Sequence, residues 1–361
     1  MKYRISIRLS RACGAEFDAQ IPYYNSGSRR DVVHFGKDQI VIEAVRKHRI
    51  VENDVFMNLQ CSLYNQLVKV LLVHYCQAGS RAGISCITVC EVKATGLEEL
   101  FCRSFAAAKQ PFAAFDGPVA FDWDALKELL GEDADSFRLR IVVMHWLSQG
   151  RHLNERQRRL ESLWRTFERL CEYHQHQPLD KRFKVGDGLE SMITELMTHA
   201  ANYPCSAAAV SGESVATLRG LRWQEMIRNN YPETAAGGQP LRRNYRDYKA
   251  TLIDPFFDER AVQLMLDVLV YRRGELQRYG LYTTIDTDLR AKLTMHQRRD
   301  MDVVALLCHY IYFLRNRLFH GQLLLRVSVF DDAAADTMRL DFLNNLLATL
   351  CVELVNNART L

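Results

Sequence analysis

The sequence predicts an α+β protein in which a small mixed α/β domain precedes an all-helical domain. Segments rich in β-branched residues, with alternating apolar and polar positions, occur in the first part of the chain. From about residue 122 onward, apolar residues recur at steps of three and four, the period of an amphipathic helix. We therefore expect an N-terminal α+β domain over residues 1–136 and a helical domain over residues 137–361, the latter of a common domain size.

The first domain is expected to combine strands with a helix. Strand-like alternation or β-branched content occurs in three segments: Tyr3–Leu9, Gln39–Glu43 and Ile84–Val92. A denser apolar pattern in Tyr64–Tyr75 favours a helix. Turn-forming residues predict loops or linkers at three further places: Asn25–Ser28, Ala78–Ser80 and Pro111–Pro118.

The second domain is expected to consist of amphipathic helices. A helix capped by Asn154 and running to about His176 has an apolar stripe that includes Leu160, Trp164 and Phe167. The same spacing recurs in three later segments: Leu189–Met197, Ala261–Leu269 and Leu343–Leu354. The pattern is weaker over Pro204–Pro240, where Gly237-Gly238 predicts a loop.

The composition is that of a globular protein with a real core, because 48% of the residues are hydrophobic and 25% are charged. The net charge of +4 is too small to mark a protein coated for nucleic acid, although a local basic patch can still bind phosphates. None of the ten cysteines forms a CxxC pair, so we expect reduced thiols and a cytoplasmic location. No apolar leader follows Met1, and Val303–Leu314 is too short to span a bilayer.

One segment combines a long apolar run with an abrupt cluster of polar residues. Asp302–Leu314 is apolar nearly all round, which predicts a buried helix, and Arg315, Asn316 and Arg317 follow it abruptly. Gly321 is suited to end the helix, which would place His320 in the last turn, where the helix dipole favours a protonated imidazole.

These residues have complementary chemical roles. A histidine at that position can act as a general acid or base near neutral pH, and the planar guanidinium of Arg315 matches a phosphate. With the 2′-hydroxyl of RNA as the nucleophile, such a site needs neither a metal nor a cofactor. Arg315 and His320 are five residues apart, however, so a regular helix directs them to different sides. Either the helix changes pitch near Phe319, or a second copy of the motif supplies the missing group across a two-fold dimer.

The segment Arg315-Asn316-Arg317-Leu318-Phe319-His320-Gly321 resembles the signature of the HEPN superfamily (higher eukaryote and prokaryote nucleotide-binding domains). The form Leu-Arg-Asn-x-Leu-Phe-His-Gly looks most like its bacterial Apea-like branch, and the upstream pattern around Trp164 and Phe167 is similar to an aromatic helix of that branch. The resemblance covers about residues 137–361. It implies a helical bundle, a homodimer through the motif helix, and a metal-independent endoribonuclease acting on RNA, in antiviral defence or as a toxin, with a regulatory protein or nucleic acid as a further partner.

The arginine–histidine spacing alone is not specific, because Arg29/His34 and Arg140/His145 also satisfy it. The competing interpretation is a catalytically silent module that serves as a dimer, partner or RNA-binding domain. In it Arg315 pairs with an acidic residue of another helix, such as Asp300 or Asp302, and His320 only caps its helix. Nucleotide transfer ranks last, because it requires clustered carboxylates and those of this chain are scattered.

Other polar clusters carry weaker signals. Additional RNA contacts are expected from Arg317 and from the basic segment Leu241–Lys249, which contains Arg242, Arg243, Arg246 and two tyrosines. A plain surface loop is the preferred alternative for this segment. The mixed charges beginning at Arg156 favour a solvated helix face. A metal site at His174-Gln175-His176, or at Cys86 and Cys90, would need further ligands that the sequence does not offer nearby. The preferred interpretation is a helix end for the histidines and core residues for the cysteines.

Overall fold

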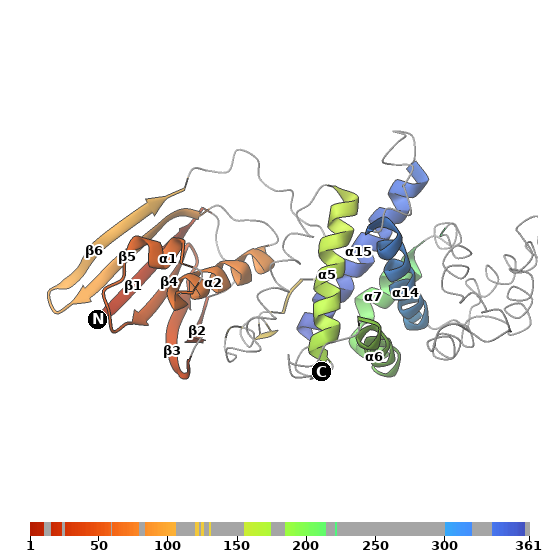
Figure 1. The fold of residues 1–361 in the computed structure, drawn as a ribbon, viewed down its shortest axis with the longest axis horizontal. Helices are drawn as coiled ribbons and strands as arrows, with labels where there is room; N and C mark the ends of the chain where they lie inside the picture. Colours follow the sequence, from red (N-terminus) through yellow and green to blue (C-terminus); the bar gives the residue numbers. More distant parts are fainter. Residues whose placement is uncertain are drawn as a thin grey trace, which may run out of the picture. The chain divides into compact units, whose positions relative to one another are not determined.

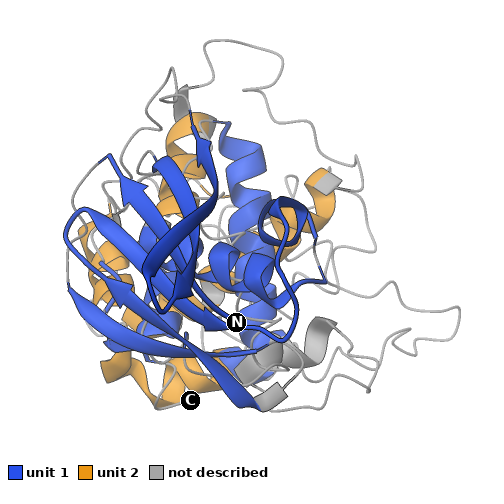
Figure 2. Ribbon diagram, turned by 90° about the vertical axis from the view of Figure 1, so that its left-hand side faces the viewer, with its two compact units in different colours: residues 1–192, 347–361 blue, residues 193–346 orange. Residues whose placement is uncertain are grey.

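The computed structural model describes residues 1–10, 16–23, 26–58, 60–78, 84–105, 120–122, 124–125, 130, 155–174, 185–213, 221, 300–319 and 334–357 of the chain. It has the mixed α+β character that the sequence predicts, with an antiparallel six-stranded sheet followed by helices (Figure 1). The chain divides into two compact units, Met1–Met192 with Leu347–Leu361, and Ile193–Leu346 (Figure 2). The expected domain boundary at residues 136 and 137 lies outside the described residues.

The sheet is formed by the first hundred or so residues, and its strand order is β2-β3-β4-β1-β5-β6. Every pairing is antiparallel, and β1 is central, with β4 on one side and β5 on the other. The strands are β1 (Lys2–Leu9), β2 (Phe17–Tyr23), β3 (Ser26–Phe35), β4 (Gln39–Val45), β5 (Ile84–Lys93) and β6 (Gly96–Ser104).

One face of the sheet forms the core of this region. Along β1, Tyr3, Ile5 and Ile7 are buried, whereas the residues between them are partly exposed. Ile5 pairs with Ile42 on β4 and with Val89 on β5, so the apolar rows continue across the strands. The helices α1 (Glu52–Phe56) and α2 (Ser62–Ala78) contribute buried residues to the same core, among them Val55, Leu63, Val70 and Val73.

The three predicted strands and the predicted helix are confirmed, but the other three strands of the sheet were not predicted. Tyr3–Leu9, Gln39–Glu43 and Ile84–Val92 became β1, β4 and β5, and Tyr64–Tyr75 lies within α2. The loop expected at Asn25–Ser28 is wrong for Ser26 onward, because β3 begins there and Ser26 pairs with Tyr23. β6 was missed because it is an edge strand whose residues are mostly exposed. β2 was missed although Phe17–Ile21 alternates apolar and polar residues.

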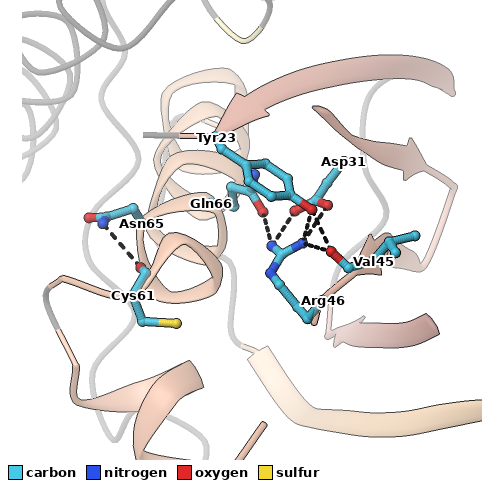
Figure 3. Close-up of polar contacts among 7 residues, drawn as sticks. All are labelled: Tyr23, Asp31, Val45, Arg46, Cys61, Asn65 and Gln66. Atoms are coloured by element: carbon cyan, nitrogen blue, oxygen red, sulfur yellow. Dashed lines mark hydrogen bonds and ion pairs between the residues drawn. The ribbon is translucent and has the colours of Figure 1, made fainter. Parts of the chain in front are cut away.

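A buried polar network connects three strands to α2. The guanidinium of Arg46 donates to both carboxylate oxygens of Asp31, at 2.8 and 2.5 Å, and to Oε1 of Gln66 at 3.1 Å (Figure 3). It also contacts Tyr23, whose hydroxyl donates to the carbonyl of Val45 at 2.6 Å. The Asp31 side chain is fully buried, and burial, followed by the Asp31 charge, raises the pKa of the Tyr23 hydroxyl. This network fixes the end of β4 against α2.

The described helices after the sheet are α5 (Arg156–His174), α6 (Val185–Thr198), α7 (Pro204–Gly212), α14 (Asp300–Phe319) and α15 (Ala334–Asn356), with a short 3-10 turn at Ala200–Asn202. The predicted apolar stripes of α5, α6 and α15 are confirmed, since Leu160, Trp164, Leu196 and Leu347 are buried. The weak prediction over Pro204–Pro240 missed α7, which begins with a proline in its first turn. The Asn154 cap, Pro111–Pro118, Gly237-Gly238 and Ala261–Leu269 lie outside the described residues.

The end of α15 is tied to a segment that precedes α5 by more than thirty residues in sequence. Asn356 Nδ2 donates to the carbonyl of Ala120 at 3.0 Å, and its Oδ1 accepts the backbone N–H of Asp122 at 2.8 Å. We expect Asn356→Ala to lose both bonds and to lower stability by about 1–3 kcal/mol. Asn356→Asp should be milder because it keeps the acceptor. Hydrogen exchange of peptides over residues 345–357 checks this; equal protection in the two variants would contradict it.

Candidate functional site

Arg315 to Phe319, the first five residues of the segment that resembles the HEPN signature, form the end of α14. This helix runs without interruption from Asp300 to Phe319 and packs against α7 within the second unit. Val304, Leu307, Ile311 and Leu314 are buried, so the prediction of a buried helix is confirmed over the described residues. The helix does not stop where the charged residues begin, because Arg315 to Phe319 continue it by more than a turn.

α14 has a half-buried stripe that consists of His309, Tyr312, Arg315 and Asn316. At 100° per residue these positions fall within an arc of about 120°. Ile311, Phe313 and Leu314 are buried, and Arg317 and Leu318 near the end of the helix are half-buried too. Tyr312 belongs to the apolar run that predicts a buried helix, and His309 interrupts that run. The seven-residue step from His309 to Asn316, two helical turns, was the signal that they share a face.

Arg315 and Asn316 are joined directly. Nη1 of Arg315 donates to Oδ1 of Asn316 at 2.9 Å, and both side chains are half-buried. The bond restricts the rotamers of a long, flexible side chain, so the guanidinium plane is held in place. Of the sequence-predicted catalytic residues, the structure thus brings Arg315 and Asn316 together, while His320 and Gly321 lie outside the described residues.

Arg317 belongs to a different face of the helix. It follows Arg315 by two residues, which is about 200° around the axis. Its guanidinium lies over the ring of Phe313, at 5.9 Å from the centroid, in the arrangement expected for an i, i+4 pair. The structure therefore does not bring Arg317 to the Arg315 stripe. The other expected RNA contacts, Arg242, Arg243 and Arg246, lie outside the described residues.

Burial keeps two titratable groups of α14 neutral. It lowers the pKa of His309 to about 4, so its imidazole carries no charge near neutral pH. It raises the pKa of Cys308 to about 12, so this thiol stays protonated and is not a nucleophile under ordinary conditions. The positive charge of the stripe near neutral pH therefore comes from Arg315.

An ion pair between Arg315 and Asp300 or Asp302 of the same chain is excluded by the helix itself. Both acids lie at the first turn of α14, fifteen and thirteen residues before the arginine. At 1.5 Å per residue they are about 20 Å or more away along the axis. The expectation that these two acids lie on another helix is therefore wrong. The silent-module interpretation cannot rest on an ion pair between Arg315 and either of them.

The remaining candidates behave as surface or structural groups. Arg158 and Arg165 form ion pairs with Glu155 and Glu161 on α5, at 3.0 and 2.6 Å, which confirms a solvated, mixed-charge face. Cys86 and Cys90, expected in the core, are half-buried, because they alternate with the buried Ile87 and Val89. Among the described residues, no group of three or more His, Cys, Asp or Glu is arranged to hold a metal ion.

None of the described helices has both the length and the apolar character that a membrane span requires. Comparisons of the chain with protein-family models, curated proteins and solved structures found no match. The candidate site is therefore defined by this chain's own residues: the Arg315–Asn316 pair and the half-buried stripe of α14.

Proposed function

We propose that this chain is a metal-independent endoribonuclease of the HEPN type, similar to the Apea-like branch, with its site at Arg315, Asn316 and His320. The observation that supports the proposal most directly is the 2.9 Å bond from Arg315 to Asn316 at the end of a buried helix. A guanidinium held in this way is prepared to receive a phosphate without first losing rotamer freedom. The proposed setting is antiviral defence or toxicity.

The proposed reaction divides the roles among three residues. Arg315 binds the scissile phosphate and stabilises the charge that develops on it, and Asn316 orients Arg315. The 2′-hydroxyl attacks phosphorus, its proton goes to an imidazole, and the P–O5′ bond breaks as the 5′-oxygen takes up a proton. The products are a 2′,3′-cyclic phosphate and a 5′-hydroxyl.

The regular geometry of α14 favours a two-fold dimer for this chemistry. The helix keeps its α-helical pattern through Phe319, so a pitch change before that residue is not available to bring the motif together. Five residues separate Arg315 from His320, which is about 140° around a continued helix. In the proposed dimer, the histidine of one copy serves the arginine of the other, and two histidines supply the base and the acid.

RNA cleavage by purified variants tests the proposal. We expect His320→Ala and Arg315→Ala each to lower the cleavage rate by about 10²–10⁴-fold, the usual contribution of such groups. EDTA should leave the wild-type rate unchanged. Arg165→Ala is the matched control, because its guanidinium is paired with Glu161 on the exposed face of α5, and it should cleave like the wild type.

Two results would contradict the ribonuclease. One is equal cleavage by wild type and His320→Ala; the other is cleavage that EDTA abolishes. His320→Asn provides a second, nearly isosteric variant, and circular dichroism shows whether either variant is folded. A two-fold axis is tested by mixing Arg315→Ala with His320→Ala: if the site is shared between copies, the mixed dimer regains part of the activity that each variant lacks.

A catalytically silent module is the second candidate. It is favoured by the fact that Arg315 is half-buried and already engaged by Asn316, as in a structural contact. This candidate predicts a stable dimer or partner complex, no cleavage of any RNA tested, and no growth defect on overexpression. Arg315→Ala would then weaken dimerisation in sedimentation experiments without any catalytic phenotype.

A further inference from the structure

A partly exposed cluster of aromatic rings and one exposed arginine lies at the β6 edge of the N-terminal sheet. Phe101 and Arg103 on β6, and Phe105 just after it, are spaced by two residues and so project from the same face of the strand. This is the face that continues the apolar rows of the core, since Arg103 pairs with Ile87 and Phe101 with Val89. We refer to Phe56, Arg103 and Phe105 as the β6 platform.

Two rings of the platform contact the guanidinium. Cζ of Arg103 is 5.0 Å from the ring centroid of Phe56 on α1 and 5.9 Å from that of Phe105. The ring of Phe101 meets that of Phe56 edge-on, with the centroids 6.2 Å apart. Because two cation–π contacts restrict the guanidinium, it has a preferred orientation although it is exposed.

Arg103 has no hydrogen bond and no ion pair within the described part of the chain. The exposed arginines of α5 differ in this respect, because Arg158 and Arg165 are paired with glutamates. The carboxylate of Asp54 on α1 is used elsewhere, accepting from the Val51 backbone at 3.2 Å and from Asn58 at 3.4 Å. The five N–H donors of Arg103 are therefore available to a ligand at the surface.

The ring next to this guanidinium is also exposed. Phe105 is 37% exposed, and its backbone N–H still bonds to the carbonyl of Ser85 at 3.0 Å, so the residue is held at the end of the sheet. A solvent-exposed phenyl ring beside an unpaired guanidinium provides the two contacts that a nucleotide-binding subsite requires. The ring can stack a base, and the guanidinium can bind the adjoining phosphate through two parallel donors.

We propose that the β6 platform binds a nucleotide of single-stranded RNA, with the base on Phe105 and the phosphate on Arg103. This inference rests on the proposed ribonuclease in naming RNA as the ligand, and it assigns to the N-terminal sheet the recruitment of that substrate. An apolar peptide fits less well, because it would cover the Arg103 charge without pairing it. A duplex fits less well too, because its bases are already stacked and paired.

Fluorescence anisotropy with the full-length chain tests the platform. The probe is a fluorescein-labelled single-stranded oligoadenylate, and all proteins carry His320→Ala so that the probe is not cut. We expect Phe105→Ala to weaken binding about 5- to 150-fold, the loss of one stacked base. Arg103→Ala should weaken binding and reduce the slope of log Kd against log salt by about 0.7, the loss of one phosphate contact to a single strand. Arg103→Lys should keep that slope.

Met338→Ala is the matched control, because Met338 is 63% exposed and belongs to the other unit. The proposal is overturned if the isotherms of Phe105→Ala and Arg103→Ala superimpose on those of Met338→Ala, or if an RNA duplex or an acidic peptide competes as well as the single strand. These outcomes are separate from the fate of the ribonuclease. Loss of binding in Phe105→Ala together with no RNA cleavage by the wild-type chain supports the platform and contradicts the enzyme, and the reverse pattern contradicts only the platform.

Discussion

Replacing Arg46 with alanine is expected to lower the stability of the N-terminal sheet by about 3–5 kcal/mol, because the fully buried carboxylate of Asp31 would lose its counter-charge. The guanidinium bonds to both oxygens of Asp31, and it also holds Gln66 on α2. A single substitution therefore leaves a buried charge and several buried polar groups without bonds. Tyr23→Phe removes only the hydroxyl and should cost about 1 kcal/mol.

Hydrogen exchange measures the loss of stability directly in peptides of the N-terminal sheet. All four tryptophans lie beyond residue 122, so their fluorescence does not come from the sheet. In Arg46→Ala, peptides covering β3 and β4 should lose protection by about 140- to 4,000-fold, at about 1.4 kcal/mol per factor of ten. Glu98→Ala removes the exposed pair with Lys93 and should leave protection essentially unchanged. Similar losses in the two variants would show that burial of Asp31 does not govern the effect.

Acidification from pH 7 to pH 4 is expected to destabilise the protein by up to about 3 kcal/mol for each of two buried histidines. Burial lowers the pKa of His74 on α2 to about 4, and it lowers the pKa of His309 on α14 to the same range. Above pH 6.5 both rings are neutral whether the chain is folded or unfolded. Between pH 6.5 and 4 only the unfolded chain takes up the protons, so stability falls through this window and levels off below it.

Replacing either His74 or His309 with leucine separates the contributions of the two histidines to the pH dependence of stability. Urea denaturation at pH 7.5, 6.0, 5.0 and 4.5, followed by a hydrogen-exchange pulse at one common pH, reports the two regions from different peptides. His74→Leu should flatten the pH dependence for peptides of the sheet and α2, and His309→Leu for peptides of α14. Equal slopes in wild type and both variants would assign the acid sensitivity to other groups.

Elements with strong periodicity were predictable because the spacing of their apolar residues follows the positions that are buried. β1, β4 and β5 are central or flanked on both sides, so their inward positions are apolar, and α5, α6 and α15 have stripes that match their buried faces. β6 is an edge strand whose residues are mostly exposed, and β3 begins with Ser26-Gly27-Ser28, so pairing with a neighbour, not burial, makes β6 and the start of β3 strands. The same reason explains the false loop at Asn25–Ser28.

The sequence by itself determined that the chain is α+β, that α14 is buried, and that Arg315 and Asn316 end its apolar run, because residue order and period suffice for each. Only the tertiary structure decided what the polar residues contact. Asp31, Arg46 and Gln66 come from three separate elements, Arg103 lies between rings of α1 and of the chain after β6, and Asp300 is a helix length away from Arg315. Such contacts depend on strand register and helix packing, which join residues that the linear pattern does not relate.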